Sequence, residues 1–98
     1  MAGYLIGNYR ITNPEAYRAY PPAVMPTLRA HSGEVLVADY ESDPVEGEPA
    51  SVTVVVRFPS KEAARAWYDS SEYQAIVSLR TDNSEGILVF ADEFVMPG

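Results

Sequence analysis

The segment FPSKEAARAWYDSSEYQAIVSLR, which runs from Phe58 to Arg80, holds the clearest structural signals in this 98-residue sequence. Pro59 cannot donate a ladder hydrogen bond, so a strand should end just before it. Ser60 is a preferred N-cap residue, and we expect it to start a helix from Lys61 to about Asp69. The segment therefore predicts a strand that leads directly into a capped helix.

A second helical run follows within the same segment. Either Ser70 or Ser71 should cap this run, which continues to the end of the segment. Trp67 and Tyr73 recur with small and aliphatic neighbours at helical spacing, which is typical of a helix face that packs on a core. We interpret the serines as caps, because a nucleophilic serine needs an adjacent base in a strained turn and the sequence offers none.

The sequence before this segment predicts a helix that prolines interrupt. Asn13 is a suitable N-cap, and Pro14 then occupies the first helical position. Three more prolines follow: Pro21, Pro22 and Pro26. An interior proline costs about 3 kcal/mol of helix stability, so we expect one short helix to Tyr20 and a second from about Pro22 to Ala30.

Four segments rich in β-branched and aromatic residues are typical of strands. They are Tyr4–Ile11, Glu34–Tyr40, Ser51–Phe58 and Ile87–Val95. The acidic segment Glu41–Ala50 separates the second from the third and should be an exposed loop. The order β-α-β-β-α-β predicts one α+β domain, residues 1–98, with the ferredoxin-like plan: a four-stranded antiparallel sheet with helices on one face.

Adjacent apolar residues on these strands indicate that both faces of the sheet are apolar. Leu5 and Ile6 are neighbours on the first strand, and Val54, Val55 and Val56 are neighbours on the third. Neighbouring residues on a strand point to opposite faces, but one chain has helices for only one face. Burying apolar surface gains about 25 cal/mol per Å². A second copy packed sheet against sheet would supply that burial, so the sequence predicts a homodimer.

The Phe58–Arg80 segment resembles the domain-of-unknown-function 1330 family, within the dimeric α+β barrel superfamily. The stretches NPEAYRAY, HSGEVLVAD and VEGE are also similar to this family, so the resemblance covers roughly Gly3 to Phe94. It implies a ferredoxin-like subunit and a dimer whose two sheets form a barrel. No activity comes with the family. The superfamily includes cofactor-independent monooxygenases, isomerases, haem-binding enzymes and plain binding modules, and fold does not choose among them.

The composition excludes several classes of function. There is no cysteine, and the single histidine rules out a site with several histidine ligands for a metal. The net charge of −7 argues against nucleic acid and anionic membranes as partners. No apolar run is long enough to span a bilayer, and no secretory signal precedes the first strand. We therefore expect a cytoplasmic protein without a cofactor or metal.

Two polar side chains on the strands are candidates for ligand binding. Asn8 and Arg57 stand at positions that could face the interior of the barrel. An arginine in a partly enclosed apolar site pairs with a carboxylate or with an anionic ligand. The alternatives are an ion pair between subunits, for instance with Asp39, Asp92 or Glu93, and an exposed position at the sheet edge.

Further candidates lie at predicted helix ends. Tyr17 and Tyr20 lie beside the proline break, and a broken helix can open a cleft. Arg80 ends its helical run, where it either meets the helix dipole or reaches a carboxylate or an anionic ligand. His31 is the only histidine, the residue type that most often acts as a general base, so it is either a general base or a C-terminal helix residue near the dipole.

Together these residues predict a site between the sheet and the broken helix. Arg57 or Arg80 would hold an anion, Tyr20 and Asn8 would donate hydrogen bonds, and His31 would carry a proton. The predicted function is a homodimer that binds a small apolar or anionic molecule, either as a binding protein or as a cofactor-independent isomerase, cyclase or monooxygenase. The alternative is a non-catalytic structural or regulatory dimer with a packed barrel.

Overall fold

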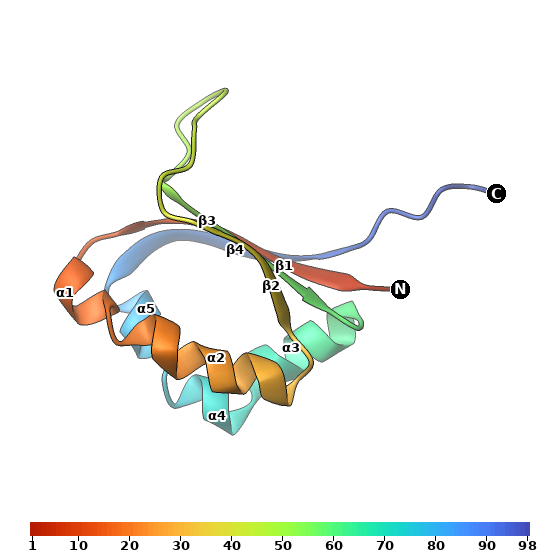
Figure 1. Ribbon diagram of the computed structural model, residues 1–98, viewed down its shortest axis with the longest axis horizontal. Coiled ribbons are helices and arrows are strands. Elements are labelled where there is room, and N and C mark those ends of the chain that lie inside the picture. Colours follow the sequence, from red (N-terminus) through yellow and green to blue (C-terminus); the bar gives the residue numbers. More distant parts are fainter.

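The computed structural model, which describes all residues from Met1 to Gly98, contains one four-stranded antiparallel sheet (Figure 1). The strands are β1 (Gly3–Ile11), β2 (Glu34–Asp39), β3 (Val52–Phe58) and β4 (Ser84–Asp92). Their spatial order is β2-β3-β1-β4, so the two strands nearest the chain ends are neighbours at one side of the sheet. This order is the ferredoxin-like plan, and the predicted fold class is confirmed.

All the helices lie on the same face of the sheet (Figure 1). They are α1 (Pro14–Tyr17), α2 (Tyr20–Ala30), α3 (Lys61–Asp69), α4 (Ser71–Gln74) and α5 (Ser78–Thr81). We call the helix-covered side of the sheet the inner face and the opposite side the outer face. None of these helices has the length and the apolar composition of a transmembrane span.

The predicted helix caps are confirmed. The side chain of Asn13 accepts a hydrogen bond from the amide of Ala16 at 3.2 Å, and Ser60 accepts one from Ala63 at 3.0 Å. Of the two serines considered for the second run, Ser70 is the cap, because its hydroxyl accepts from the amide of Tyr73 at 3.2 Å. These side chains satisfy amide donors that the first turn of each helix leaves unpaired.

The predicted position of the proline break is wrong by about two residues. The chain leaves α1 after Tyr17, and α2 already begins at Tyr20. Pro21 and Pro22 therefore occupy the first turn of α2, where a missing amide hydrogen costs nothing. Only Pro26 lies inside the helix.

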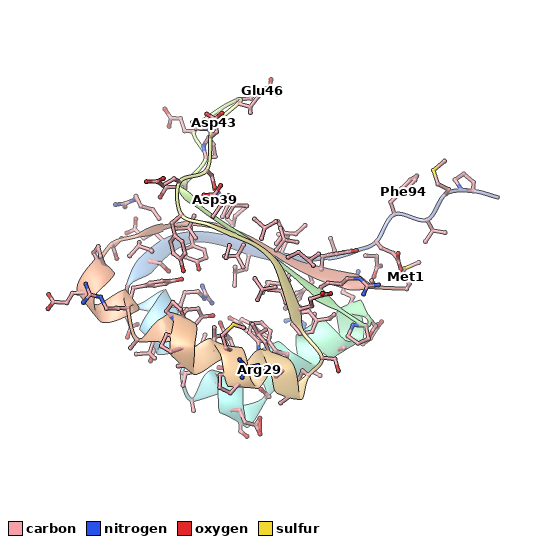
Figure 2. All side chains as sticks on the ribbon, viewed as in Figure 1. Met1, Arg29, Asp39, Asp43, Glu46 and Phe94 are labelled. Carbon is pink, nitrogen blue, oxygen red and sulfur yellow. The ribbon has the colours of Figure 1, made fainter.

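The predicted bounds of the fourth strand are also wrong. The strand begins at Ser84 instead of Ile87 and ends at Asp92 instead of Val95. The reason is its partner, because β1 pairs with it from Ile11 opposite Ser84 to Gly3 opposite Asp92. Beyond Asp92 a single backbone hydrogen bond, from Glu93 N–H to the carbonyl of Ala2 at 3.0 Å, still joins the two segments, and the residues around Phe94 extend away from the domain (Figure 2).

The core fills the space between the inner face and the helices. Its largest fully buried side chains are Trp67, Tyr73, Phe58, Val52 and Val56. Trp67 donates its indole N–H to the hydroxyl of Thr27 at 2.9 Å, which links α3 to α2 inside the core. The packing role predicted for Trp67 and Tyr73 is confirmed.

Gly3 allows α3 to approach the sheet at its first turn. A Cβ atom on Gly3 would lie 2.3 Å from the backbone nitrogen of Lys61. Because that atom is backbone and cannot swing away, any larger residue would push the helix off the strand. The end of β3 and the start of α3 are thus held against β1.

Candidate ligand-binding cavity

A small cavity remains between the inner face and the helices, with a volume of about 130 Å³. Residues from all four strands and from the helices line it, and nearly all of them are apolar or aromatic. The lining comprises Leu5, Tyr9, Tyr17, Tyr20, Pro21, Val24, Met25, Leu28, Val35, Ala38, Tyr40, Val54, Val56, Trp67, Tyr73, Arg80 and Leu88. Its polar groups are the tyrosine hydroxyls, the indole N–H and one guanidinium.

The mouth of the cavity lies between α2 and β2. Among the lining residues, Met25 on α2 is 36% exposed and Tyr40, just after β2, is 45% exposed. The deeper lining residues, such as Trp67 and Tyr73, are fully buried. A molecule from solvent would therefore enter past the edge strand β2 and the proline-rich helix.

A β-bulge in β2 places residues of this strand at the mouth. Val35 pairs with Val56, but Val37 then pairs with Val55, so the register shifts between them. The extra residue moves Ala38, opposite Val54, to the inner face. Without the shift, strict alternation would turn Ala38 and Tyr40 to the outer face.

Tyrosine hydroxyls in the cavity form two hydrogen-bonded pairs. The hydroxyl oxygens of Tyr9 and Tyr17 are 2.7 Å apart, and those of Tyr20 and Tyr73 are 2.8 Å apart. Burial raises the pKa of Tyr9, Tyr17 and Tyr20 above the ordinary tyrosine value. These three phenols therefore stay protonated at neutral pH and act as hydrogen-bond groups, not as bases.

Arg80 brings a positive charge to this apolar site. Its side chain is buried, with 8% of the residue exposed, and its Nε donates to the Tyr73 hydroxyl at 3.3 Å. The ion pairs of the structure join other residues, namely Arg10 with Glu85 and Lys61 with Asp92. No carboxylate lines the cavity, so the guanidinium has no acidic partner there.

The structure brings together only part of the predicted site. Tyr17, Tyr20 and Arg80 all line the cavity. Asn8 and Arg57 do not, because β1 and β3 present them on the outer face, and Arg57 is exposed there opposite Tyr4. The prediction that these two residues share a pocket with Tyr20 is wrong, because it treated the two faces of the sheet as one surface.

Asn8 has a structural role in this fold. Its amide nitrogen donates to the carbonyl of Ala50 at 3.0 Å and to that of Val52 at 3.1 Å. Its amide oxygen accepts from the backbone nitrogen of Ala50 at 2.8 Å. Asn8 thus anchors the end of the long loop to β1 where β3 begins.

His31 lies outside the cavity lining, so the predicted proton carrier is not in the site. It forms the C-cap of α2, and its Nδ1 is 3.2 Å from the carbonyl oxygen of Thr27. This position matches the structural alternative, in which a histidine interacts with the C-terminal end of a helix.

Sequence reasoning missed Tyr9 and Tyr40 as members of the site. Tyr9 could have been found, because it shares the inner-face alternation of Leu5 and Gly7 on β1. Tyr40 could not, because the bulge that turns it inward leaves no sequence signal. Tyr73 was predicted to pack in the core, and its hydroxyl contact with Arg80 depends on where two separate helical elements meet.

A second, larger depression of about 720 Å³ lies between α3 and β4. It is an open groove, and its cationic side chains already have partners. Lys61 pairs with Asp92 at 3.3 Å, and the guanidinium of Arg65 lies 4.9 Å from the centre of the Phe90 ring. No group of His, Cys, Asp or Glu side chains in the molecule is arranged to hold a metal ion. The smaller inner cavity is the better candidate site, because its cation is buried without an acidic partner, whereas Lys61 and Arg65 in the groove are exposed to solvent.

Comparison with known proteins supports this fold. The family model described as domain of unknown function (DUF1330) matches residues 2–94. The protein of unknown function RPA0582 from Rhodopseudomonas palustris has a similar structure, with a TM-score of 0.79 and 15% identity over 97% of this chain and 84% of that chain. A methylated form of RPA0582 gives a TM-score of 0.76 at 19% identity, over 99% of this chain and 83% of that one.

A third similar structure is HapK from Hahella chejuensis. It gives a TM-score of 0.58 at 12% identity and covers 98% of this chain and 96% of that chain. No curated protein matches this sequence. At such low identities the solved structures establish a shared fold and nothing about activity.

Proposed function

The chain belongs to the DUF1330 family, and we propose that it is a homodimer that binds a small molecule in the cavity of each subunit. The observation that carries this proposal is a single one. The otherwise closely packed core contains an aromatic cavity, and a buried arginine without an acidic partner lines this cavity. Cavities with an apolar lining and a few convergent polar groups are typical of ligand sites.

The proposed dimer follows from the outer face of the sheet. Val37, Val55, Ile6 and Val89 are paired across all four strands and form an apolar row there. Ile6 is 38% exposed and Val89 is 47% exposed, although both are large apolar residues. A contiguous apolar surface of this kind marks an interaction site, and a two-fold contact would cover both copies at once.

Binding is better supported than catalysis. The lining contains no Asp, Glu, His or Lys side chain, so it has no group that accepts a proton near neutral pH. The tyrosines and Arg80 supply hydrogen-bond donors and a positive charge, which stabilise negative charge on a bound molecule. Chemistry in this cavity would be confined to reactions that such stabilisation assists.

The competing function is a structural dimer without a ligand. One observation favours it, because about 130 Å³ is well below the roughly 300–1,000 Å³ of usual ligand pockets. A cavity of about 150 Å³ nevertheless holds a molecule the size of benzene, as an engineered cavity in another protein shows. The proposed ligand is therefore a compact one.

The test uses Trp67, which lines the cavity and is the only tryptophan of the chain. Compact aromatic probes, both neutral and charged, should change its fluorescence in a saturable way. Ala38→Phe at the mouth should block this change, whereas Val45→Phe on the exposed loop should not. Identical titrations for the two variants, or no saturable binding of any probe, would remove the proposed function in favour of the structural dimer.

A further inference from the structure

We propose that the ligand is a compact monocarboxylate, a single ring or short branched chain whose carboxylate binds the guanidinium of Arg80. This inference rests on the proposed function and narrows it to a chemical class. The argument has three parts: the state of Arg80, the free protons of the tyrosine pairs, and the size and charge of the cavity.

Arg80 retains unused donors that face open space. The structure contains one hydrogen bond from its side chain, from Nε to the Tyr73 hydroxyl. Apart from a weaker contact of the guanidinium with the Tyr20 hydroxyl, the two terminal Nη atoms have no protein acceptor, yet the molecule has no fully buried side-chain nitrogen or oxygen without a partner. The Nη atoms are therefore not sealed within protein atoms, and the space beside this buried side chain is the cavity that it lines.

A buried guanidinium without an acidic partner is stabilised by binding an anion. Removing a charge from water costs several kcal/mol unless an opposite charge and hydrogen bonds compensate. The lining contains no carboxylate, and the two ion pairs of the structure involve other cations. The compensating anion must come from outside the chain, and two terminal nitrogens favour a planar carboxylate held by parallel hydrogen bonds.

The tyrosine pairs leave further donors free. In each pair one hydroxyl donates to the other, so the second O–H proton is not used within the pair, and the Tyr9–Tyr17 pair has a further hydroxyl contact only with Tyr40 at the mouth. Tyr73 accepts from Arg80 as well, which occupies its oxygen and leaves the pair with an uncommitted proton. The site is therefore rich in donors and poor in acceptors, which suits the oxygen atoms of a carboxylate.

Size and charge restrict the ligand further. The cavity of about 130 Å³ is close to the roughly 150 Å³ that accommodates benzene. One guanidinium balances one negative charge, so a phosphate dianion would bring a second charge into an apolar lining with nothing to neutralise it. The remaining lining, from Leu5 to Leu88, suits a hydrocarbon body.

The experiment compares benzoate with benzamide, which has the same shape without the charge. Each is titrated into the intact protein while Trp67 fluorescence is followed, with calorimetry as a second readout. We expect benzoate to bind at least tenfold more tightly than benzamide, and inorganic phosphate not to compete with it. Similar affinities for benzoate and benzamide would overturn the carboxylate assignment while leaving a cavity that binds small molecules.

Variants of Arg80 sharpen the same experiment. Arg80→Met should weaken benzoate binding at least tenfold and leave benzamide binding unchanged. The benzoate affinity of Arg80→Lys should lie between those of Arg80→Met and the wild type. Arg29→Met, at an exposed arginine on α2 (Figure 2), is the matched control and should bind like the wild type. Full benzoate affinity in a folded Arg80→Met protein would overturn the proposal.

The remaining outcomes are also decisive. If Arg80→Met does not fold, the wild-type comparison of benzoate with benzamide decides alone. If neither aromatic probe binds but phosphate does, the site is an inorganic anion site and the carboxylate assignment fails. If no probe binds the wild type, the ligand-binding function fails with it.

Discussion

The two faces of the sheet carry alternate residues of the same strands, but they differ in how completely their apolar side chains are buried. On the inner face Leu5, Val56 and Phe58 are almost completely buried. On the outer face their neighbours Ile6 and Val89 keep more than a third of their surface exposed. The helices account for this difference, since all of them lie on the inner side (Figure 1).

The difference shows which face this chain completes by itself. The inner face combines large aromatic side chains with hydroxyl and indole groups that find partners within the chain, such as Trp67 with Thr27. The outer face carries aliphatic residues that have nothing above them. Its long loop, with Asp43 and Glu46 near the tip, also rises on this open side (Figure 2). The chain thus covers its inner face by itself, around a small cavity, and leaves the outer face uncovered for the contact that we propose with a second copy.

The largest expected effect comes from the inner face. Trp67→Ala removes a fully buried ring that touches both α2 and the sheet, so the free energy of unfolding should fall by about 3–5 kcal/mol. Since domains are stable by only about 5–15 kcal/mol, this variant should be close to unfolded. Urea unfolding followed by circular dichroism, at one fixed protein concentration, measures the change. Phe94→Ala, at a residue that is 78% exposed, is the control and should lie within about 0.5 kcal/mol of the wild type. A small loss for Trp67→Ala would mean that the inner face is not the core.

The next largest expected effect is a change in oligomeric state, which tests the outer face. Ile6→Lys places a charge in the centre of the outer apolar row, where burial against a second copy would strip it of water. We expect the mass from light scattering at micromolar concentration to fall from that of a dimer to that of a monomer. Val45→Lys adds the same charge on the exposed loop, where the residue is 89% exposed, and should leave the dimer intact. A dimer that survives Ile6→Lys would show that the outer face is not the interface.

Most of the fold could be predicted from the sequence because its signals are local. The caps at Asn13 and Ser60 and the alternation along β1 each depend on residues close together in the chain. The errors arose where a distant partner decides the outcome. The ends of β4 follow the length of β1, and the start of α2 depends on how the first turn accommodates Pro21 and Pro22.

The site was predicted less well, because assigning a strand residue to one face needs the register. Arg80, Tyr17 and Tyr20 were predicted as ligand candidates, and they do line one cavity. Asn8 and Arg57 were placed with them because composition marks polar strand residues without saying which way they point. The bulge in β2, which brings Tyr40 to the mouth, has no counterpart in the sequence pattern.

A smaller effect distinguishes the structural role of Asn8 from a ligand-binding role. Asn8→Ala removes the hydrogen bonds to Ala50, leaving its partly buried backbone groups without partners, so stability should fall by about 1–3 kcal/mol. Benzoate affinity should not change, because Asn8 lies on the outer face and Arg80 does not. Ser42→Ala, which removes a neighbouring hydroxyl contact with Thr53, is the control for general weakening of the loop. Loss of benzoate binding by a stably folded Asn8→Ala protein would mean that the two faces of the sheet act as one site.

The smallest expected effect is the dependence of stability on alkaline pH, which tests the buried tyrosines of the inner face. Burial raises the pKa of Tyr9, Tyr17 and Tyr20 in the folded state above the value of 10.0 that applies to the unfolded chain. The unfolded chain therefore loses protons above about pH 10 that the folded protein keeps, so their contribution to stability is complete below that pH and declines as the pH rises beyond it. Denaturant midpoints should be measured from pH 7 to 11. The buried tyrosines should cause no change in the midpoint up to about pH 10 and a decrease above it. In Tyr17→Phe one buried phenol is gone, so the denaturant midpoint should fall less steeply above about pH 10. Below that pH the midpoint should still not depend on pH. An equally steep fall in that variant would mean that the alkaline loss comes from groups elsewhere than the tyrosine pairs of the cavity.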